Sequence, residues 1–450
     1  MEQKESIKME DRASDSLDKI RQQFDTAPYP RVPLDYYPND LKWLYVHNIV
    51  TAYYLRYKRV IETEGKVILD AGCGSGYKTL ELAVANPGAK IVGIDISEES
   101  IKLARQRLQY HGFEAEFYTL SIENLPELGI KFDYINNDEV LYLLPDPVAG
   151  LQAMKSVLKA DGVIRTNLHS SLQRVHYYRA QQVFKMMGLM DENPRELEID
   201  LVRDTMKALK DNVSLKVYTW EPESENDEEG LLMNYLFQED KGYTVPEMFS
   251  ALRSADLEFV SMVNPTSWDL MELFKEPDNL PVFLGTSLPT LSVEERLHLF
   301  ELLHPVNRLL DFWCGHLNSA SPVVPVDEWT MADWQEALVH IHPGLRTPEI
   351  KKEMVTCVSD IILMEIGKYL PFLKDPIFLM DTTVTACVLP LQEGPQPIGA
   401  LVERWKQVRP VNPATLQPIE ENEAFEMVKQ ILTTLEQIGY VLLERRLGKG

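Results

Sequence analysis

The most chemically suggestive stretch of the sequence is a run of glycines at alternate positions, Gly72, Gly74 and Gly76, directly after the apolar residues 66–70. Glycines in this pattern let the backbone turn tightly and leave room for a ligand against it. The spacing is G-x-G-x-G, whereas the dinucleotide fingerprint needs G-x-G-x-x-G. Asp70 stands two positions before the first glycine, and its carboxylate would repel a pyrophosphate but suits a ligand that carries an ammonium group.

A second carboxylate follows at a distance that suits a nucleoside. Asp95 lies nineteen residues after Gly76, at the end of the apolar run 90–95, where a carboxylate can accept hydrogen bonds from both hydroxyls of a ribose. Ser121, Ile122 and Glu123 follow the next apolar run and would line an adenine. Because the carboxyl ends of parallel strands meet in one crevice, these three groups predict a single nucleoside-binding site.

These residues resemble motifs I and II of the class I S-adenosylmethionine-dependent methyltransferases, which read DAGCGSG and VGIDIS here. The resemblance implies S-adenosylmethionine as the cofactor. It implies that residues 70–76 hold its methionine part, Asp95 its ribose, Ile96 its adenine, and Ser121 and Ile122 the polar edge of the adenine. The candidate cofactor-binding residues are Asp70, Gly72, Cys73, Gly74, Gly76, Asp95, Ile96, Ser121, Ile122 and Asn137.

Two segments carry candidate acid–base groups. Asn137 and Asp138 fall where members of this family meet the reacting atom, and Asp138 would accept a proton, hold an amine or cap the following turn. His169, directly after a predicted strand, is either the other acid–base group or a surface or hinge residue. Tyr29 is a candidate substrate contact, since N-terminal segments cap the active site in this superfamily; the alternative is ordinary packing. Tyr142, in the same segment as Asn137 and Asp138, is a second candidate substrate contact.

The elements that must position these residues form an alternating pattern. Strands are expected over 66–70, 90–95, 116–120, 132–137 and 162–168, with helices over 77–86, 97–110 and 146–158. The pattern predicts an α/β fold with a Rossmann-like, doubly wound parallel sheet. A helix and strand over 245–263 form a sixth step, after a mostly helical insertion at about 169–243. A seventh strand is not obvious, and residues 290–316 are expected to form one or two helices.

The length of 450 residues predicts several domains. We expect an N-terminal cap segment over 1–65, the methyltransferase domain over 66–265, a helical region and linker over 266–345, and a small α+β, winged-helix-like domain over 346–450. This layout loosely resembles bacterial protein lysine methyltransferases with a regulatory middle region. The acidic run 221–229 is interpreted as a solvated loop, and the alternative is a role in substrate binding.

The composition of the chain restricts which partners it can bind and in which cellular compartment it is expected. The net charge of −24 disfavours nucleic acids and anionic membranes. The four cysteines show no CxxC spacing, and the histidines show no ligand spacing, so we expect no metal and a reducing compartment. The first twenty residues lack the apolar core of a signal peptide, and the sequence shows no apolar run of membrane-spanning length, which predicts a cytoplasmic protein.

Three function classes remain open. The leading hypothesis is methylation of a side-chain nitrogen, of lysine or asparagine, in a protein substrate. The related alternative is a small-molecule methyltransferase that acts on a quinone, a phenol or another natural product. The third is a cofactor-binding scaffold without catalysis. The sequence does not fix the oligomeric state.

Overall fold

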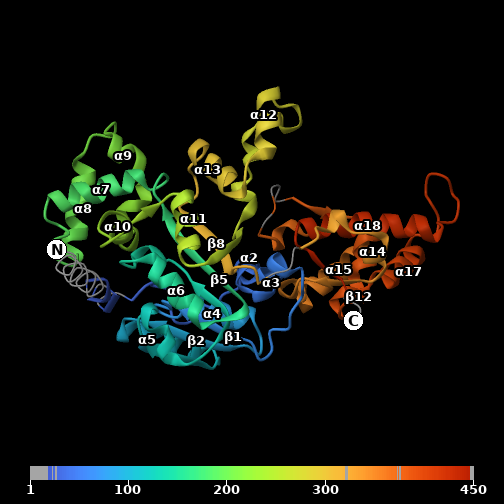
Figure 1. Cartoon of the computed structure of the whole chain (residues 1–450), viewed down its shortest axis with the longest axis horizontal. Helices are drawn as coiled ribbons and strands as arrows, with labels where there is room; N and C mark the ends of the chain where they lie inside the picture. Colours follow the sequence, from blue (N-terminus) through green and yellow to red (C-terminus); the bar gives the residue numbers. More distant parts are fainter. Residues whose placement is uncertain are drawn as a thin grey trace.

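The computed structural model describes residues 19–22, 24–25, 28–319, 323–371, 373 and 377–445. Its largest element is a sheet in the order β3-β2-β1-β4-β5-β8-β7, with the short strand β6 (Gly242–Tyr243) paired to β5 (Figure 1). The strands are β1 (Val67–Ala71), β2 (Lys90–Asp95), β3 (Ala115–Thr119), β4 (Phe132–Asn137), β5 (Leu158–Ser170), β7 (Leu257–Met262) and β8 (Leu309–His316). Strands β1 to β5 run parallel, and β8 is antiparallel to both of its neighbours. The predicted doubly wound α/β fold is confirmed.

Helices cover both faces of this sheet because successive strand residues point to opposite sides. Leu69 and Ile135 pack in one core with α6 (Pro147–Val157) and α11 (Val245–Ser254). Ile68 and Tyr134 pack in the other core. The helices of that second face are α3 (Ile49–Tyr57), α4 (Tyr77–Ala85) and α5 (Glu98–Tyr110). The carboxyl ends of β1 to β5 are thereby held at one edge.

The seventh strand of the sheet is β8. The prediction of helices over residues 290–316 is therefore wrong for residues 309–316, which form this strand. Helix α12 (Val282–Ser287) lies before the predicted range. Helix α13 (Val293–Leu303) forms within it, but the chain then returns to the sheet between β5 and β7. The run LLDFWCGH is a short apolar stretch, and periodicity does not separate such a strand from a buried helix. Trp313 and Cys314 are fully buried in it.

The insertion after β5 is a separate helical layer with its own core. It consists of α7 (Val175–Met186), α8 (Glu196–Ala208), α9 (Ser214–Thr219), a 3-10 helix over Pro222–Asn226 and α10 (Glu228–Tyr235). Phe184, Val202 and Tyr235 lie at its centre. The acidic run is therefore not a single loop, because most of it forms this 3-10 helix and its last two residues begin α10.

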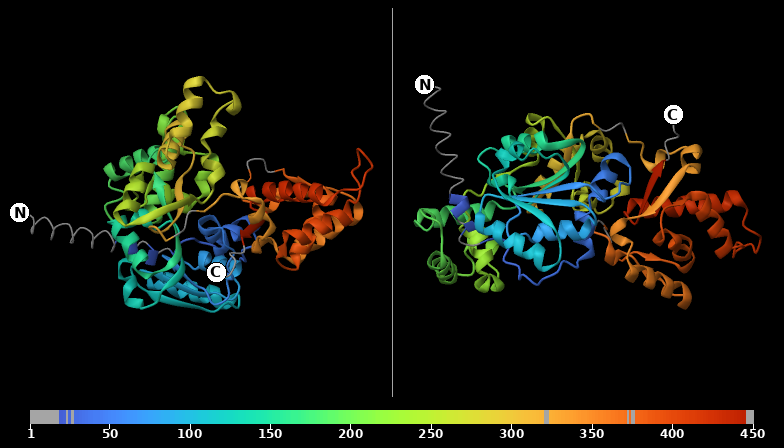
Figure 2. Two further views of the ribbon diagram at one scale, coloured as in Figure 1. Left: turned by 45° about the vertical axis from the view of Figure 1, so that its right-hand side comes forward. Right: turned by 90° about the horizontal axis from the view of Figure 1, so that it is seen from below.

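The C-terminal part is a small α+β unit beside the large sheet (Figure 2). Its sheet order is β12-β9-β13, all antiparallel, and it also holds the ribbon β10–β11. The strands are β9 (Ala337–Ile341), β10 (Met364–Glu365), β11 (Leu379–Met380), β12 (Gln396–Pro397) and β13 (Val441–Arg445); the helices are α14 (Met331–Gln335), α15 (Pro348–Asp360), α16 (Thr382–Val388), α17 (Ile398–Val408) and α18 (Glu421–Gln437).

The predicted domain boundaries do not follow these sheets. Strand β8, from the expected linker region 266–345, belongs to the large sheet, and β9, from the same region, is the central strand of the small one. Val326 and Trp334 also pack in the C-terminal core, which therefore begins about twenty residues before position 346. Residues 1–18 of the expected N-terminal cap lie outside the described residues.

Two N-terminal helices join the two sheets. Helix α2 (Leu41–His47) and α3 precede β1, and their tyrosines reach the C-terminal unit. The Tyr45 hydroxyl donates to the carbonyl of Gly439 at 2.9 Å, and the Tyr54 hydroxyl accepts from the backbone N–H of Leu443 at 2.9 Å. Among the described helices, none is both long and apolar enough to pass through a bilayer.

Candidate active site

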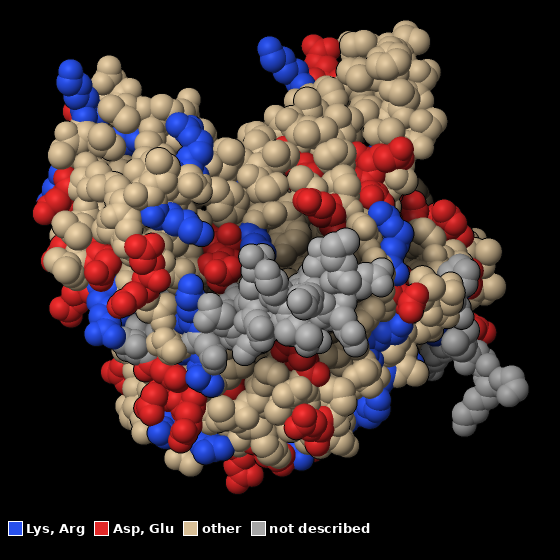
Figure 3. All heavy atoms as spheres, turned by 60° about the vertical axis from the view of Figure 1, so that its left-hand side comes forward, with Lys and Arg blue, Asp and Glu red and all other residues tan. Residues whose placement is uncertain are grey.

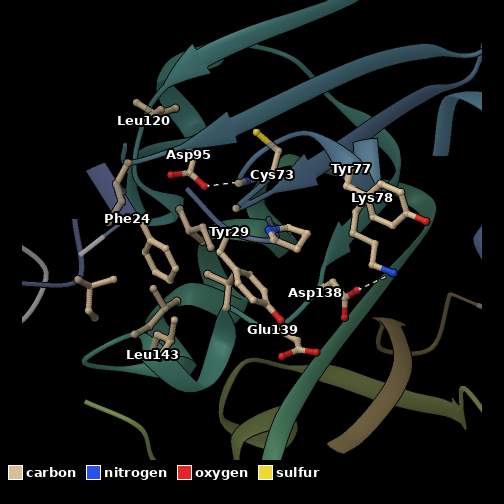
Figure 4. A pocket seen from close by; sticks show the side chains of 18 of the residues that line it. Phe24, Tyr29, Cys73, Tyr77, Lys78, Asp95, Leu120, Asp138, Glu139 and Leu143 are labelled. Carbon is tan, nitrogen blue, oxygen red and sulfur yellow. Dashed lines mark hydrogen bonds and ion pairs between the residues drawn. The ribbon is translucent and has the colours of Figure 1, made fainter. Parts of the chain in front are cut away.

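A cavity of about 330 Å³ lies at the carboxyl ends of β1, β2, β3 and β4 (Figure 4). The predicted residues that line it are Tyr29, Gly72, Cys73, Gly74, Asp95, Ile96, Ile122 and Asp138. The structure thus brings together groups that are separated by more than a hundred positions in the chain.

The glycine loop owes its shape to three left-handed backbone positions, with φ of 87° at Gly72, 49° at Gly74 and 80° at Gly76. A Cβ on Gly74 would collide with the carbonyl oxygen of Tyr29, which accepts from the backbone N–H of Ser75 at 2.9 Å. Gly76 does not line the cavity. A Cβ there would lie 2.6 Å from the Cα of Ala104, so this glycine lets α4 approach α5.

Asp95 closes the loop from the side of β2. Its carboxylate accepts the N–H of Gly74 at 2.9 Å and the N–H of Ser97 at 2.8 Å, one on each oxygen. Burial raises the pKa of Asp95 to about 6, against the effect of these two donors. Asp95 lines the cavity, and because a carboxylate oxygen can accept more than one hydrogen bond, this position fits the hydroxyls of a ribose.

The far end of the cavity suits an adenine ring. Ile96, Leu120 and Ile122 supply apolar walls, and Glu123 joins them. One carboxylate oxygen of Glu123 is buried and has no hydrogen-bond partner in the described part of the chain. An unpaired acceptor fits an exocyclic amine. Of the three residues predicted to line an adenine, Ile122 and Glu123 line the cavity and Ser121 does not.

Asp70 lies beneath the loop and not in the cavity. Its carboxylate accepts from the Thr79 hydroxyl at 2.6 Å and from the Asn136 side-chain amide at 2.8 Å. Burial raises its pKa to about 6. Asn137 is also buried below the floor, where its amide donates to the carbonyl of Ala71 and accepts from Thr166. Both side chains position the loop and do not touch the cavity.

Asp138 lies at the other end of the cavity as an ionised carboxylate. It accepts from Asn167 at 2.6 Å and faces Arg165 at 3.5 Å and Lys78 at 3.8 Å (Figure 4). Burial acts to raise its pKa, but Arg165 and Lys78 outweigh it and hold the pKa at about 2. A group this acidic is a poor proton acceptor at neutral pH. Asp138 is therefore already paired with two cationic side chains of the protein and does not suit the predicted role of proton acceptor.

A second cavity of about 280 Å³ adjoins the first and shares Tyr29 and Glu139 with it. Glu139 holds a left-handed backbone with φ of 59°, fixed by its N–H, which donates to the Asn167 side chain at 2.8 Å. Such strain in a residue other than glycine is typical of functional sites. Figure 4 shows the Tyr29 ring extending toward Glu139, and these are the two residues that line both cavities.

His169 and Tyr142 line this second cavity, where their rings stack with centroids 3.7 Å apart. His169 Nδ1 lies 2.6 Å from Asp240, and its Nε2 lies 3.0 Å from Arg308. A guanidinium only donates, so Nε2 accepts and Nδ1 carries the proton toward Asp240. Burial lowers the pKa of His169, which keeps the imidazole neutral.

Sequence reasoning missed several partners in these cavities. Asp240 and Arg308 lie far from His169 in the chain, and only the paths of the insertion and of β8 bring them to it. Asp227 and Glu229, from the acidic run, line the second cavity and do not face solvent alone. Arg165 is fully buried between Asp138 and Asp311.

Comparisons with known proteins agree with this geometry. Residues 62–235 match a family model described as a methyltransferase domain. An uncharacterised protein of Synechococcus sp. is 28% identical over 326 residues, which cover 71% of this chain and 75% of that protein. The ubiquinone biosynthesis O-methyltransferase of Actinobacillus pleuropneumoniae is 36% identical over 105 residues, which cover 22% of this chain and 44% of that enzyme.

A solved structure shares the fold over most of the chain. PKMT2 from Rickettsia typhi superimposes with a TM-score of 0.58 at 16% identity, and the match covers 92% of this chain and 77% of that one. PKMT2 has also been solved in complex with AdoHcy, with a TM-score of 0.56. The motifs, the cavity and the matching family model agree, and the chain carries a class I S-adenosylmethionine-dependent methyltransferase domain.

Proposed function

We propose that this methyltransferase transfers the methyl group of S-adenosylmethionine to the side-chain amine of a lysine in a protein substrate. The observation that carries the proposal is the charge of the second cavity. Its described lining includes three carboxylates, Glu139, Asp227 and Glu229, and two guanidinium groups, Arg174 and Arg308.

A fourth carboxylate, Asp240, lies directly behind His169 and pairs with Arg174. With His169 neutral, the carboxylates outnumber the cations by two. A cavity with excess negative charge attracts an ammonium group and repels an anion. The charge favours lysine over the neutral amide of asparagine as the acceptor.

The architecture supports a large acceptor. The insertion and the C-terminal unit have cores of their own, so the chain offers extensive surface beyond the cofactor site. Figure 3 shows a deep indentation between two projecting parts of the surface, with acidic and basic side chains at its rim. Such a surface suits the grip of a folded partner.

A second candidate function is O-methylation of a small phenol or quinol. The observation in its favour is the pair of Asp240 and His169, because a neutral imidazole with an accepting Nε2 can take a phenolic proton. The partial match to a ubiquinone biosynthesis O-methyltransferase is in line with this candidate but spans less than half of that enzyme.

One labelling experiment separates the two. The protein is incubated with methyl-deuterated S-adenosylmethionine and a lysate of a deletion strain, and the proteins are hydrolysed for amino-acid mass spectrometry. We expect deuterated methyl-lysine. Two controls are matched to it. A lysate whose lysines have been acetylated chemically should not be labelled, and the Asp95→Ala enzyme should transfer less label when S-adenosylmethionine is limiting. If the label enters only organic-soluble compounds, the lysine proposal is wrong and the small-molecule function is favoured.

A further inference from the structure

Arg308 occupies the junction between the cofactor cavity and the second cavity. Its guanidinium donates to both carboxylate oxygens of Glu139 and, at 3.0 Å, to Nε2 of His169. Its side chain is 42% exposed, whereas the side chain of His169 is 2% exposed. The one lone pair with which His169 can accept a proton is therefore covered by a cation that solvent reaches.

The parts around Arg308 differ in how firmly they are held. The backbone carbonyl of Arg308 accepts from Ser170 at 2.8 Å at the start of β8, and the N–H of Glu139 donates to Asn167. Asp240 is buried and is bound by His169, Arg174 and Gln181. A rotation of the Arg308 side chain alone would therefore uncover His169 without moving a strand.

We propose that the ammonium group of the acceptor lysine displaces Arg308 from Glu139, and that this displacement exposes Nε2 of His169 as the base that deprotonates the lysine. This inference rests on the proposed function. Glu139 then pairs with the lysine ammonium group in place of the Arg308 guanidinium, so its negative charge stays paired with one positive charge. Because Arg308 returns when no acceptor is present, the base is available only with substrate in place.

The step balances in atoms and charge. The ammonium N–H bond breaks, its proton goes to Nε2 of His169, and the electron pair stays on the amine nitrogen. That pair forms the new bond to the methyl carbon of S-adenosylmethionine, and the electrons of the breaking C–S bond go to sulfur, which becomes a neutral thioether. The imidazolium, paired with Asp240, then passes its proton to water.

The charged and titratable groups that face His169 come from four elements. Asp240 lies in the segment before β6, Arg174 begins α7, Arg308 precedes β8, and the Tyr142 ring stacks from the turn after β4. Asp240 acts to raise the pKa of His169, and Arg174 and Arg308 act to lower it. Loss of the Arg308 charge therefore raises the pKa of His169, and less of the imidazole is neutral at a given pH.

The test uses the full chain and three variants, Arg308→Gln, His169→Gln and the control Arg253→Gln. Arg253 lies on α11, lines neither cavity, and pairs with Glu294. The rate of methyl transfer to a lysine peptide is measured against pH. We expect the acid limb to move to higher pH in Arg308→Gln and to stay in place in Arg253→Gln. In His169→Gln the rate at pH 7 should fall about 100-fold.

A measurement independent of turnover is ¹⁵N NMR of the histidines, with N-acetyl-lysine amide as the probe. The probe should move the Nε2 resonance of His169 in the unmodified protein, and in Arg308→Gln the resonance should already lie at the shifted position. Identical resonances and acid limbs in Arg308→Gln and the unmodified protein would overturn the inference. A resonance that shifts in Arg308→Gln, together with methylation of small phenols only, would overturn the proposed function instead.

Discussion

At the scale of the residue, Asp95 has two roles, one in holding the backbone around the glycine loop and one in binding the cofactor. It holds the backbone through the N–H groups of Gly74 and Ser97, and we propose that it also accepts hydrogen bonds from the ribose. Asp95→Ala should weaken the binding of S-adenosylmethionine by about 1.5–3 kcal/mol, because charge-assisted hydrogen bonds are lost. Isothermal titration calorimetry measures this difference directly, and an unchanged affinity would contradict the assignment of the cavity.

The same residue makes cofactor binding depend on pH. The ionised carboxylate is the form that accepts from the ribose, and burial raises the pKa of Asp95 to about 6. Affinity should therefore be constant above about pH 7 and fall as the pH drops through 6, by at most about tenfold per pH unit. Asp95→Asn should bind more weakly at neutral pH with a flat profile. A fall of equal slope in Asp95→Asn would assign the titration to another group.

A comparison of two glycines distinguishes the effect of backbone strain from the effect of a steric clash. Gly74 and Gly129 both have positive φ, but a Cβ on Gly74 would meet the Tyr29 carbonyl, whereas a Cβ on Gly129 has nothing within 4 Å. Gly129→Ala should cost about 1 kcal/mol of stability without a change in cofactor affinity. Gly74→Ala should reduce that affinity as well, since Tyr29 must move. Urea unfolding and calorimetry on both variants provide the comparison.

At the scale of the element, β8 completes the sheet. Trp313 is fully buried there, and its indole N–H donates to the Tyr134 hydroxyl at 3.1 Å. Trp313→Ala should lower the free energy of unfolding by about 3–5 kcal/mol. The exposed Trp43, on α2, is the matched control, and its alanine variant should lose about 1 kcal/mol or less. Equal losses in chemical denaturation would place Trp313 outside the core.

Elements whose chemistry is local could be predicted from the sequence. The glycine loop and the strands up to β5 follow from apolar runs, turn residues and spacing, so Asp95, Ile122 and Asp138 were found. Strand β8 could not, because its eight residues pair with partners about 50 and 150 positions away. Arg308 and Asp240 were missed for the same reason, since their contacts with His169 exist only after the insertion and β8 are in place.

At the scale of the whole molecule, α2 and α3 join the two sheets. A chain that ends at residue 319 keeps every strand of the large sheet and every residue of both cavities. It should bind S-adenosylmethionine with little change in affinity. In the shortened chain Tyr45 and Tyr54 would be exposed to solvent, because the C-terminal residues that they contact are missing. Its melting temperature should therefore be several degrees lower than that of the full chain.

Calorimetry and differential scanning fluorimetry measure the two properties separately. Full-length protein with Tyr54→Phe serves as the intermediate case, because it loses the hydroxyl that accepts from Leu443 and keeps the ring. A marked loss of cofactor affinity in the shortened chain would mean that the C-terminal unit shapes the glycine loop through α2 and α3.

The place of β8 also has a consequence for synthesis on the ribosome. The cofactor motif is made early, yet β5 keeps an unpaired edge and β7 lacks a neighbour until residues 309–316 emerge. An open strand edge in a nascent chain is a point for misassociation with other chains. The catalytic half of this enzyme therefore closes late in translation, and we expect it to depend on chaperones that shield the growing polypeptide until that strand has been added.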